Sequence, residues 1–352
     1  MKKTERQQKE SVVLTGNIWS RLRFHRIEKG SFILTDQSDP HTADAVRYQE
    51  GIDFEVDYEN GKIRRLPGSA LPDFEKNPSC HAGFRSVNLQ EIADFGLWHC
   101  RQYTAYASYR YEADGNESYG QVVARINQKN QTALPLKLAR AVLEKKNLVY
   151  GVMGDSISTG CEALEGNSYF SLFADYMKSL GAFVEIHNVA VGGTTSSEAP
   201  GAACRLFEEG ARPDLVTIGY GMNDMCSLGN ESGTAPADYI ANTRAAVEQI
   251  RARSDREPEI MLISSMPANP IWNYASGGSS ALAEALRDYA KEAALPIADA
   301  NALCHSELDH GKRYPELIVS LINHPGDYGH YLYFLTLKSL LDGALREIHG
   351  CG

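Results

Sequence analysis

The chain has 352 residues, of which 43% are hydrophobic and 23% are charged, an ordinary composition for a folded globular protein without disorder or collagen-like repeats. Its formal net charge is -10 and no basic patch stands out, which argues against nucleic-acid binding, because phosphate neutralisation needs clustered Lys and Arg. The length exceeds that of one typical domain, so the sequence predicts two cores.

The cysteines and the first residues bear on the compartment. The seven cysteines are widely spaced, without a C-x-x-C pair, so reduced thiols are expected. The opening MKKTERQQKESVVL lacks the apolar core and cleavage site of a secretory signal, and no apolar run approaches the ~20 residues of a membrane-spanning helix. We therefore expect a cytoplasmic protein without a membrane partner.

The first part of the chain, residues 1–118, alternates short β-like runs with turn signals. FEVDY and KIRRL flank Glu59, Asn60 and Gly61, and an Asn-Gly step supplies the positive φ angles of a tight hairpin. The sequence predicts a small, jelly-roll-like β-sandwich domain. Aromatic residues are frequent here and suit strands, so we expect them to fill its core, with a sugar-stacking face as the alternative. These aromatics include Tyr48, Phe54, Tyr58, Trp98, Tyr103, Tyr106, Tyr109 and Tyr111.

Residues 119–145 are predicted to form a connector, in which LPLKLARAVLEKKN has apolar residues at helical spacing behind Pro135. Residues 146–352 then alternate two patterns. Strand-like runs that are apolar nearly throughout occur at 147–155, 182–193, 213–224, 259–267 and 295–300. Amphipathic, helix-like runs occur at 167–181, 236–253, 280–294 and 328–348. This alternation predicts a parallel sheet covered on both faces, with the ligand site beyond the carboxyl ends of the strands.

Polar residues and glycines follow these strands. Ser156 comes after the first strand, Gly193 after the second and Asn223 after the third, while His324 opens the last segment. Acyl transfer needs a nucleophile, a base and donors aimed at the oxygen that becomes negative. Ser156 would attack, and His324 would take its proton, since an imidazole has an unperturbed pKa near ~6.5. The N–H groups of Ser156 and Gly193 and the amide of Asn223 would form the oxyanion hole.

Four blocks of sequence carry a family resemblance. GDSIS, NVAVGGTTS, GYGMND and NHPGDYGH, in this order, resemble the SGNH hydrolase family, also called GDSL esterases and lipases. The resemblance covers the chain from about residue 146 to its end. It implies a flavodoxin-like three-layer α/β/α sandwich with a parallel sheet, and ester hydrolysis without a metal or other cofactor. A β domain joined to such a domain is similar to certain carbohydrate esterases.

The sequence departs from the family pattern before the histidine. Many members carry Asp three residues before it, whereas this chain has Leu321. We therefore expect a Ser156–His324 dyad, with the imidazole oriented by another group such as a backbone carbonyl or Glu316. Asp155 and Asp224 would support the site by bracing their loops.

Several of these residues also have a structural alternative. Ser156 could cap the next helix, and Asn223 could hold its own loop. His324, Asp327 and His330 together offer two imidazoles and a carboxylate, which are metal ligands. The position of Asp327 at a helix N-cap and of His330 in the first turn disfavours a metal site, and no metal is expected.

The sequence thus predicts a serine esterase that hydrolyses small acyl esters through an acyl-enzyme intermediate, with O-acetyl groups on carbohydrates as the favoured substrates. One alternative is a general short-chain or lipid esterase, because the motif residues bind the carbonyl and not the alcohol. Another is a binding module with a catalytically weak domain, suggested by Leu321. The expected partner is a small-molecule or carbohydrate ester, and a homo-oligomer is compatible with the sequence.

Overall fold

The structure, a computed structural model, describes residues 3–77, 80, 99–208, 210–226, 233–272, 275 and 277–350. It divides into two units, and neither is one continuous stretch of chain. Unit 1 comprises Met1–Tyr119, Asn269–Asn273 and His305–Gly329; unit 2 comprises Gly120–Ala268, Tyr274–Cys304 and His330–Gly352. The first boundary lies next to the expected residue 118, but two later segments group with the N-terminal strands. Trp98 and Cys351 lie outside the described residues, and the six described cysteines form no disulfide with one another.

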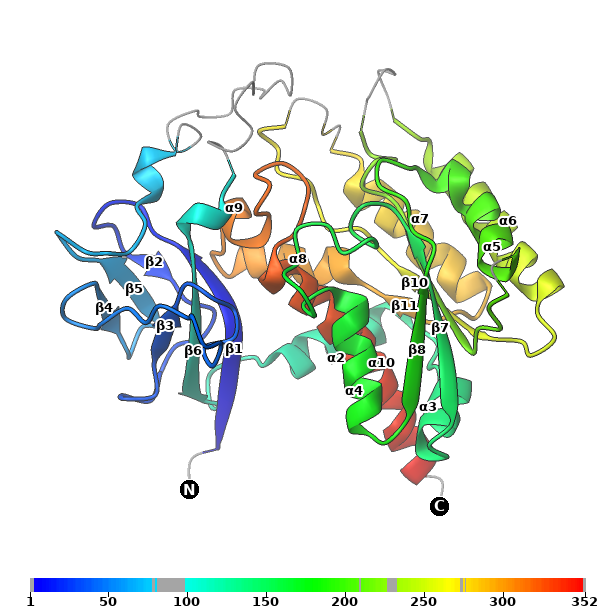
Figure 1. The fold of residues 1–352 in the computed structure, drawn as a ribbon, viewed down its shortest axis with the longest axis horizontal. Helices are drawn as coiled ribbons and strands as arrows, with labels where there is room; N and C mark the ends of the chain where they lie inside the picture. The colour runs from blue at the N-terminus through cyan, green and yellow to red at the C-terminus, as the bar shows by residue number, and fades with distance from the viewer. Residues whose placement is uncertain are drawn as a thin grey trace. The chain divides into compact units, whose positions relative to one another are not determined.

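Unit 1 contains two three-stranded antiparallel sheets (Figure 1). One sheet has the order β1-β6-β3, with β1 (Thr4–Val13), β6 (Thr104–Glu112) and β3 (Ile33–Thr35). The other has the order β2-β5-β4, with β2 (Ser20–Arg21), β5 (Lys62–Arg65) and β4 (Phe54–Asp57). The predicted hairpin is confirmed: β4 pairs with β5, and Gly61 has φ +60°. The small β domain expected from the sequence is present.

Aromatic rings fill the core of unit 1 and link its two sheets. Phe32 lies between Phe54 of β4 and Tyr109 of β6, with ring centroids 5.6 and 5.5 Å away. Phe24 stacks on Tyr111 with centroids 3.9 Å apart. Because these rings pack on one another inside the unit, they support the predicted core role and not a sugar-stacking face.

A bulge in β1 turns a carboxylate into this core. The pairing of β1 with β6 shifts between Gln7 and Glu10, and Lys9 has φ +58°. A bulge places an extra residue in one strand and thereby changes which side chains point inward. Glu10 is consequently fully buried, and its Oε2 accepts a hydrogen bond from the Tyr109 hydroxyl at 2.5 Å.

Two residues from late in the chain, the cation Lys312 and the carboxylate Glu307, complete this buried network. The Lys312 ammonium lies 2.5 Å from Glu10 Oε1 and donates to the carbonyl oxygen of Ser11 at 2.9 Å. The Arg23 guanidinium lies 2.7 Å from Glu307, which also accepts from the Tyr328 hydroxyl. Buried charges are tolerated when they are paired and hydrogen-bonded. These pairs explain why 305–329 belongs to unit 1.

The pKa values of the central pair reflect burial and mutual attraction. Burial raises the pKa of Glu10, and the Lys312 charge opposes that rise without cancelling it. Burial by itself would lower the pKa of Lys312, but the carboxylates of Glu10 and Glu316 outweigh it and raise that pKa. The lysine is therefore charged at neutral pH.

Three short helical segments lie among the residues of unit 1 that the structure describes. They are η1 (Phe74–Lys76), η3 (Arg101–Tyr103) and α9 (Tyr314–Leu317). Helix α8 (Ala300–Asp309) leads from unit 2 into the late segment of unit 1.

Unit 2 is built on a five-stranded parallel sheet of order β11-β10-β9-β7-β8. Its strands are β7 (Asn147–Gly154), β8 (Phe183–Asn188), β9 (Leu215–Gly219), β10 (Glu259–Ile263) and β11 (Ile297–Ala298). Numbered within the sheet, this is the 2-1-3-4-5 order of flavodoxin-like folds. The predicted fold class is confirmed.

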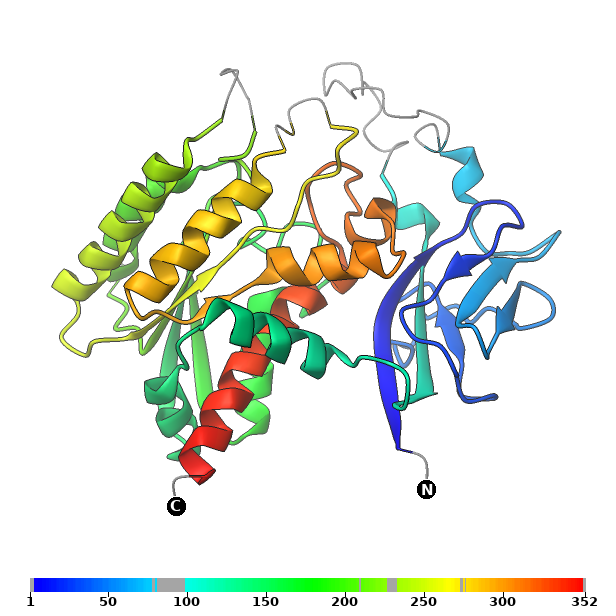
Figure 2. The ribbon, with the colours of Figure 1, turned by 180° about the vertical axis from the view of Figure 1, so that it is seen from behind.

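Helices cover both faces of this sheet (Figures 1 and 2). One layer contains α4 (Tyr169–Ser179) and α10 (Asp327–Gly350), and the other contains α5 (Ala199–Glu208), α6 (Pro236–Arg253) and α7 (Ser279–Glu292). Neighbouring residues of β7 face opposite layers: Tyr150 packs on Phe173 of α4, and Gly151 lies against Leu206 of α5. A Cβ at position 151 would lie 2.8 Å from Leu206 Cδ2, so any larger residue there would require this leucine to move.

The expected connector contains two helices. The predicted one is α3 (Leu136–Leu143), directly after Pro135. The other, α2 (Tyr119–Asn130), was not predicted, although its Val122, Val123 and Ile126 are buried on one side. Among the described residues, no helix combines the length and apolarity that crossing a membrane requires.

We predict that Lys312→Met lowers the free energy of unfolding of the full chain by about 3–5 kcal/mol, because it leaves the buried Glu10 carboxylate without its cation. The double variant with Glu10→Gln should regain a large part of this loss. Urea unfolding of both variants measures the effect. Lys137→Met is the control, since its ion pair with Glu257 is exposed and is expected to contribute less than ~1 kcal/mol. An equal loss in the control variant and in Lys312→Met would contradict the argument.

Candidate active site

The turn that carries Ser156 begins where β7 ends. A Cβ at Gly154, the last residue of β7, would lie 2.3 Å from the carbonyl oxygen of Gly219 in β9, so only glycine permits this approach. Ser156 is 8% exposed. Its carbonyl oxygen accepts hydrogen bonds from the Cys161 N–H at 3.1 Å and the Thr159 hydroxyl at 2.7 Å. The serine is therefore held in a closed turn at the carboxyl end of its strand.

The capping alternative for Ser156 does not hold. The next helix, α4, begins at Tyr169, and its N-cap is Ser168, whose hydroxyl accepts from the N–H of Ser171. The helix cap is thus supplied by a different serine.

The segment after β8 lies against the Ser156 turn. The Val191 N–H donates to the carbonyl oxygen of Gly154 at 3.1 Å, and a Cβ at Gly192 would lie 3.7 Å from the Cβ of Ser156. Gly193 has φ +79°, and a Cβ there would meet nothing within 4 Å. The glycine pair therefore forms a left-handed turn beside the serine, with open space in front of Gly193.

The loop after β9 braces the loop after β8. Asn223 donates from Nδ2 to the carbonyl oxygen of Thr194 at 2.8 Å. The Asp224 carboxylate accepts from the N–H of Ser196 at 2.9 Å and from its hydroxyl at 2.6 Å. Asn223 thus holds the neighbouring loop through Thr194, whereas its structural alternative had it hold its own loop. Its amide nitrogen carries two hydrogens, so this bond uses only one of them.

Ser156, Gly193 and Asn223 are brought together within unit 2. Strands β7 and β9 are neighbours in the sheet, although β8 lies between them in the sequence. The strand order reverses there, and ligands of such folds bind outside the carboxyl ends of the strands at that point. The three predicted residues follow β7, β8 and β9 at this position.

The two aspartates of these loops are buried and interact. Burial raises the pKa of Asp155 to about 7, against the opposing effect of hydrogen bonds from the N–H groups of Ile157 and Met222, and the nearby Asp224 charge adds to the rise. Burial likewise raises the pKa of Asp224, and the bonds from Ser196 oppose it. Both carboxyls bind backbone N–H groups, which supports the bracing role expected of them.

His324 lies in unit 1, in the loop between α9 and α10. Its backbone N–H donates to the Ser320 hydroxyl at 2.8 Å, and Ile318 pairs with Pro325 in an antiparallel bridge. The pairing of His324 with Ser156 stays a prediction, because the two residues belong to different units.

Glu316, the suggested orienting carboxylate, has a full set of partners elsewhere. Its Oε2 accepts from the Arg313 N–H at 2.8 Å, which completes the capping box of α9. Its Oε1 accepts from the Val13 N–H at 3.5 Å and lies 3.6 Å from the Lys312 ammonium. These contacts favour a structural role in which Glu316 ties α9 to β1.

The remaining members of the metal alternative also have partners. The Asp327 carboxylate accepts a hydrogen bond from the Ser38 hydroxyl. His330 is fully buried, and its Nδ1 accepts from the Tyr169 N–H at 3.4 Å while its Nε2 faces the carbonyl oxygen of Cys161 at 3.2 Å. With both ring nitrogens bonded to backbone, His330 has no nitrogen left for a metal.

Two residues that hold the histidine loop were missed. Ser320 accepts from the N–H groups of both Asn323 and His324, at 3.2 and 2.8 Å. A serine four residues before a histidine in a turn is a recognisable signal, because hydroxyls bond to nearby backbone. Asn269 holds the carbonyl oxygens of Leu321 and Ile322, at 2.7 and 2.8 Å, and no local signal points to it.

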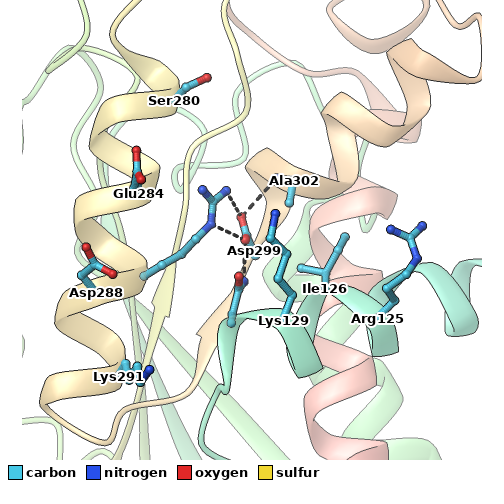
Figure 3. Close-up of a pocket in the computed structure, with 11 residues that line it drawn as sticks. Arg125, Ile126, Lys129, Ser280, Glu284, Asp288, Lys291, Asp299 and Ala302 are labelled. Atoms are coloured by element: carbon cyan, nitrogen blue, oxygen red, sulfur yellow. Dashed lines mark hydrogen bonds and ion pairs between the residues drawn. The ribbon is translucent and has the colours of Figure 1, made fainter.

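A separate cavity of about 540 Å³ in unit 2 lies between α2 and α7 (Figure 3). Asp299 forms its floor and accepts from Arg287 Nε and Asn130 Nδ2, both at 2.7 Å. Burial alone would raise the pKa of Asp299, but the Arg287 contacts hold it below its usual value. Lys129 and Asp288 stand on opposite walls. None of the described lining residues belongs to the predicted site. The charges of Asp299 and Arg287 on the floor of the cavity neutralise each other.

Similar structures have been solved, although no curated protein matches the chain. A two-domain esterase (CEX) active on acetylated mannans is 18% identical with a TM-score of 0.48, and the match covers 61% of this chain and 55% of that one. The chain therefore spans about half the length of that esterase. TesA is 21% identical with a TM-score of 0.44, over 56% of this chain and 99% of that one. A catalytic mutant of Axe2, an acetylxylan esterase from Geobacillus stearothermophilus, is 18% identical with a TM-score of 0.45. That match covers 56% of this chain and 94% of the Axe2 chain.

A family model accounts for the four blocks together. The model of the GDSL-like Lipase/Acylhydrolase family matches residues 152–332, which is just over half of the chain. The match begins before Ser156 and ends after His324, so it includes residues from both units. The chain belongs to the GDSL-like lipase/acylhydrolase family, a family of carboxylic ester hydrolases.

Proposed function

We propose that the protein is a serine esterase that hydrolyses small acyl esters through an acyl-enzyme intermediate. The observation that carries the proposal is the arrangement in unit 2, where Ser156 follows β7 at the switch point and the Gly192–Gly193 turn lies against it. A serine that merely ended a strand would not need two further loops braced around it. Family membership supports the same chemistry.

In the proposed reaction, Ser156 Oγ attacks the ester carbonyl carbon while an imidazole nitrogen of His324 takes the hydroxyl proton. The tetrahedral intermediate then collapses, and the alcohol leaves with the proton returned by His324. Water attacks the acyl-enzyme in the same way, with His324 again as base, and the carboxylic acid is released. A serine, an imidazole and water suffice for these steps, so no cofactor is proposed.

The oxyanion would be stabilised by the N–H groups of Ser156 and Gly193 and by the second amide hydrogen of Asn223. The bond from Asn223 to Thr194 fixes the plane of the amide group, so the other hydrogen has a set direction. Donors that are already oriented stabilise a developing charge without reorganisation. The structural bond and the proposed catalytic role of Asn223 are therefore compatible.

The favoured substrate is an O-acetyl group on a carbohydrate, proposed from the combination of a β domain with a domain of this family. The alternative is a general short-chain or lipid esterase. A catalytically weak binding module is the other candidate, because Leu321 occupies the position where many members carry the acid.

We predict that Ser156→Ala abolishes ester hydrolysis and reaction with a fluorophosphonate probe, since both need the activated hydroxyl. His324→Ala should reduce both strongly. In the wild type, kcat/KM should rise with pH as His324 loses its proton and then level off. Ser197→Ala, a change of an exposed serine in the same unit, is the control and should keep wild-type activity.

Activity is measured on aryl acetate, longer aryl esters and acetylated xylan. A preference for acetylated carbohydrate supports the favoured substrate, and a preference for longer acyl chains supports the lipid esterase. A wild-type serine that stays unlabelled from pH 6 to 9 would favour the binding module.

We predict that Asn223→Ala lowers kcat by about 10²–10³-fold, the usual cost of losing one oxyanion donor. The matched control is Asn188→Ala, which removes a comparable loop bond, from Nδ2 to the carbonyl oxygen of Ser158 at 2.8 Å. Steady-state kinetics on an aryl acetate compares the two variants. Similar losses in kcat would reduce Asn223 to a loop-holding residue.

We predict that Asp155→Asn changes how stability depends on pH. The carboxyl pKa is about 7 in the folded chain against an ordinary value of 3.8, so between these values the folded state binds more protons than the unfolded state. The wild type therefore loses stability as pH rises through this range. The variant lacks this loss, so its stability relative to the wild type rises by up to about 1.4 kcal/mol per pH unit and levels off above pH 7.

Urea unfolding from pH 4.5 to 8 measures this difference. Asp299→Asn is the control, because the pKa of Asp299 lies below its usual value and its contribution is constant over this range. If the free energies of unfolding of the wild type and of Asp155→Asn changed with pH in parallel, the raised pKa of Asp155 would be contradicted.

A further inference from the structure

The loop that carries His324 is closed and buried within unit 1. Besides the Ile318–Pro325 bridge, the Gly326 N–H donates to the carbonyl oxygen of Leu317 at 3.4 Å. Residues 318–322 are each at most 4% exposed. The residues that lead into His324 are therefore buried, while His324 itself is partly exposed.

Leu321 is the residue at which this loop is anchored. Its backbone has φ +72°, in the left-handed region that costs a leucine roughly 1–2 kcal/mol. Its side chain is 1% exposed and forms one cluster with Val13 of β1, Phe74 of η1 and Cys100. A strained backbone persists only where the surroundings impose it, and here the surroundings are β1, η1 and the residue before η3.

Hydrogen bonds fix the backbone on both sides of Leu321. The Cys100 N–H donates to the carbonyl oxygen of Val319 at 2.7 Å. Asn269 donates its side-chain amide to Leu321 and its backbone N–H to Ile322. Three hydrogen bonds from two residues outside the loop thus fix positions 319, 321 and 322, and both residues belong to unit 1.

We propose that Leu321 is a positioning residue, through which the N-terminal β unit orients the His324 imidazole in place of the acid that many family members carry at this position. The proposal rests on the proposed function, in which His324 is the catalytic base. An aliphatic side chain offers no acceptor for an imidazole N–H, so it acts only through the backbone that it anchors.

The rate that a catalytic triad loses without its acid shows why the His324 imidazole needs another orienting group. In a serine–histidine–acid triad, changing the orienting carboxylate costs about 10⁴-fold in rate, because the imidazole is no longer held in its working state. An active enzyme with leucine in this position needs another source of orientation. A loop whose backbone is fixed at residues 319, 321 and 322 restricts the histidine that follows two residues later.

The test compares Leu321→Ala with Leu34→Ala, which removes an equally buried leucine from β3 of the same unit. We expect Leu321→Ala to lower kcat on an aryl acetate on the order of 10²-fold, as misplaced catalytic groups do, with KM changed far less. Its pH profile should also shift, because the environment of the base changes. Leu34→Ala should lose stability without either effect.

A second pair of variants guards against simple unfolding. Val13→Ala touches the cluster from β1 and leaves the loop sequence intact, and Val56→Ala makes the same change in the other sheet. Hydrogen exchange of the full chain should show faster exchange at residues 318–324 in Leu321→Ala and Val13→Ala only. This measurement does not depend on activity.

Equal effects of the paired variants on kcat, pH profile and exchange would overturn the positioning role while leaving the esterase proposal in place. An inactive wild type whose Ser156 does not react with the probe would overturn the proposed function, and the catalytic role of Leu321 with it. Loop-specific exchange would then show only that Leu321 anchors the loop.

Discussion

One buried ammonium group holds the two ends of unit 1 together. The Lys312 side chain lies between the carboxylates of Glu10 and Glu316, so residues from the start and the end of the chain neutralise one another in the interior. The ammonium lowers the cost of burying both carboxylates, and Glu316 has the Arg313 guanidinium 3.7 Å away as a second cation. The same late segment of unit 1 carries the histidine loop, so this contact and the anchors of Leu321 together join that segment to the N-terminal part of the unit.

The fold of unit 2 could be predicted because its signals are local. Buried parallel strands appear in the sequence as continuous apolar runs, and β7, β8, β9 and β10 all begin and end within the expected ranges. The glycines and polar residues after the first three strands indicated a shared site, and the strand order places them at one rim. Helix α5 was missed, because Pro200 and Gly201 stand in its first turn and are typical of loops.

The composition of unit 1 could not be predicted in the same way. Glu10 and Lys312 look like surface charges in the sequence, and their burial depends on a bulge in β1 and on partners hundreds of positions away. The role suggested for Glu316 followed from its distance to His324 along the chain alone. Its partners are instead the N–H group of Arg313, three residues earlier at capping-box spacing, and the N–H group of Val13, which no spacing rule would have identified.

Leu321 shows how one substitution in a motif can change which part of a protein does a task. A carboxylate next to an imidazole acts directly, through one hydrogen bond and one charge. A leucine in the same position can act only by packing, so the task passes to Val13, Phe74 and Cys100, which lie in another part of the chain. A β domain that would otherwise count as an accessory thereby becomes part of the proposed machinery.

The chain begins unit 1, then forms most of unit 2 and returns to complete unit 1 with residues 305–329. This order has a consequence for biosynthesis. Proteins leave the ribosome from the N-terminus, and domains made of one continuous segment can fold as they emerge. Here Glu10 and Arg23 are synthesised before the parallel sheet, and their counter-ions Lys312 and Glu307 are synthesised after it. Unit 1 can therefore mature only after the parallel sheet has been made.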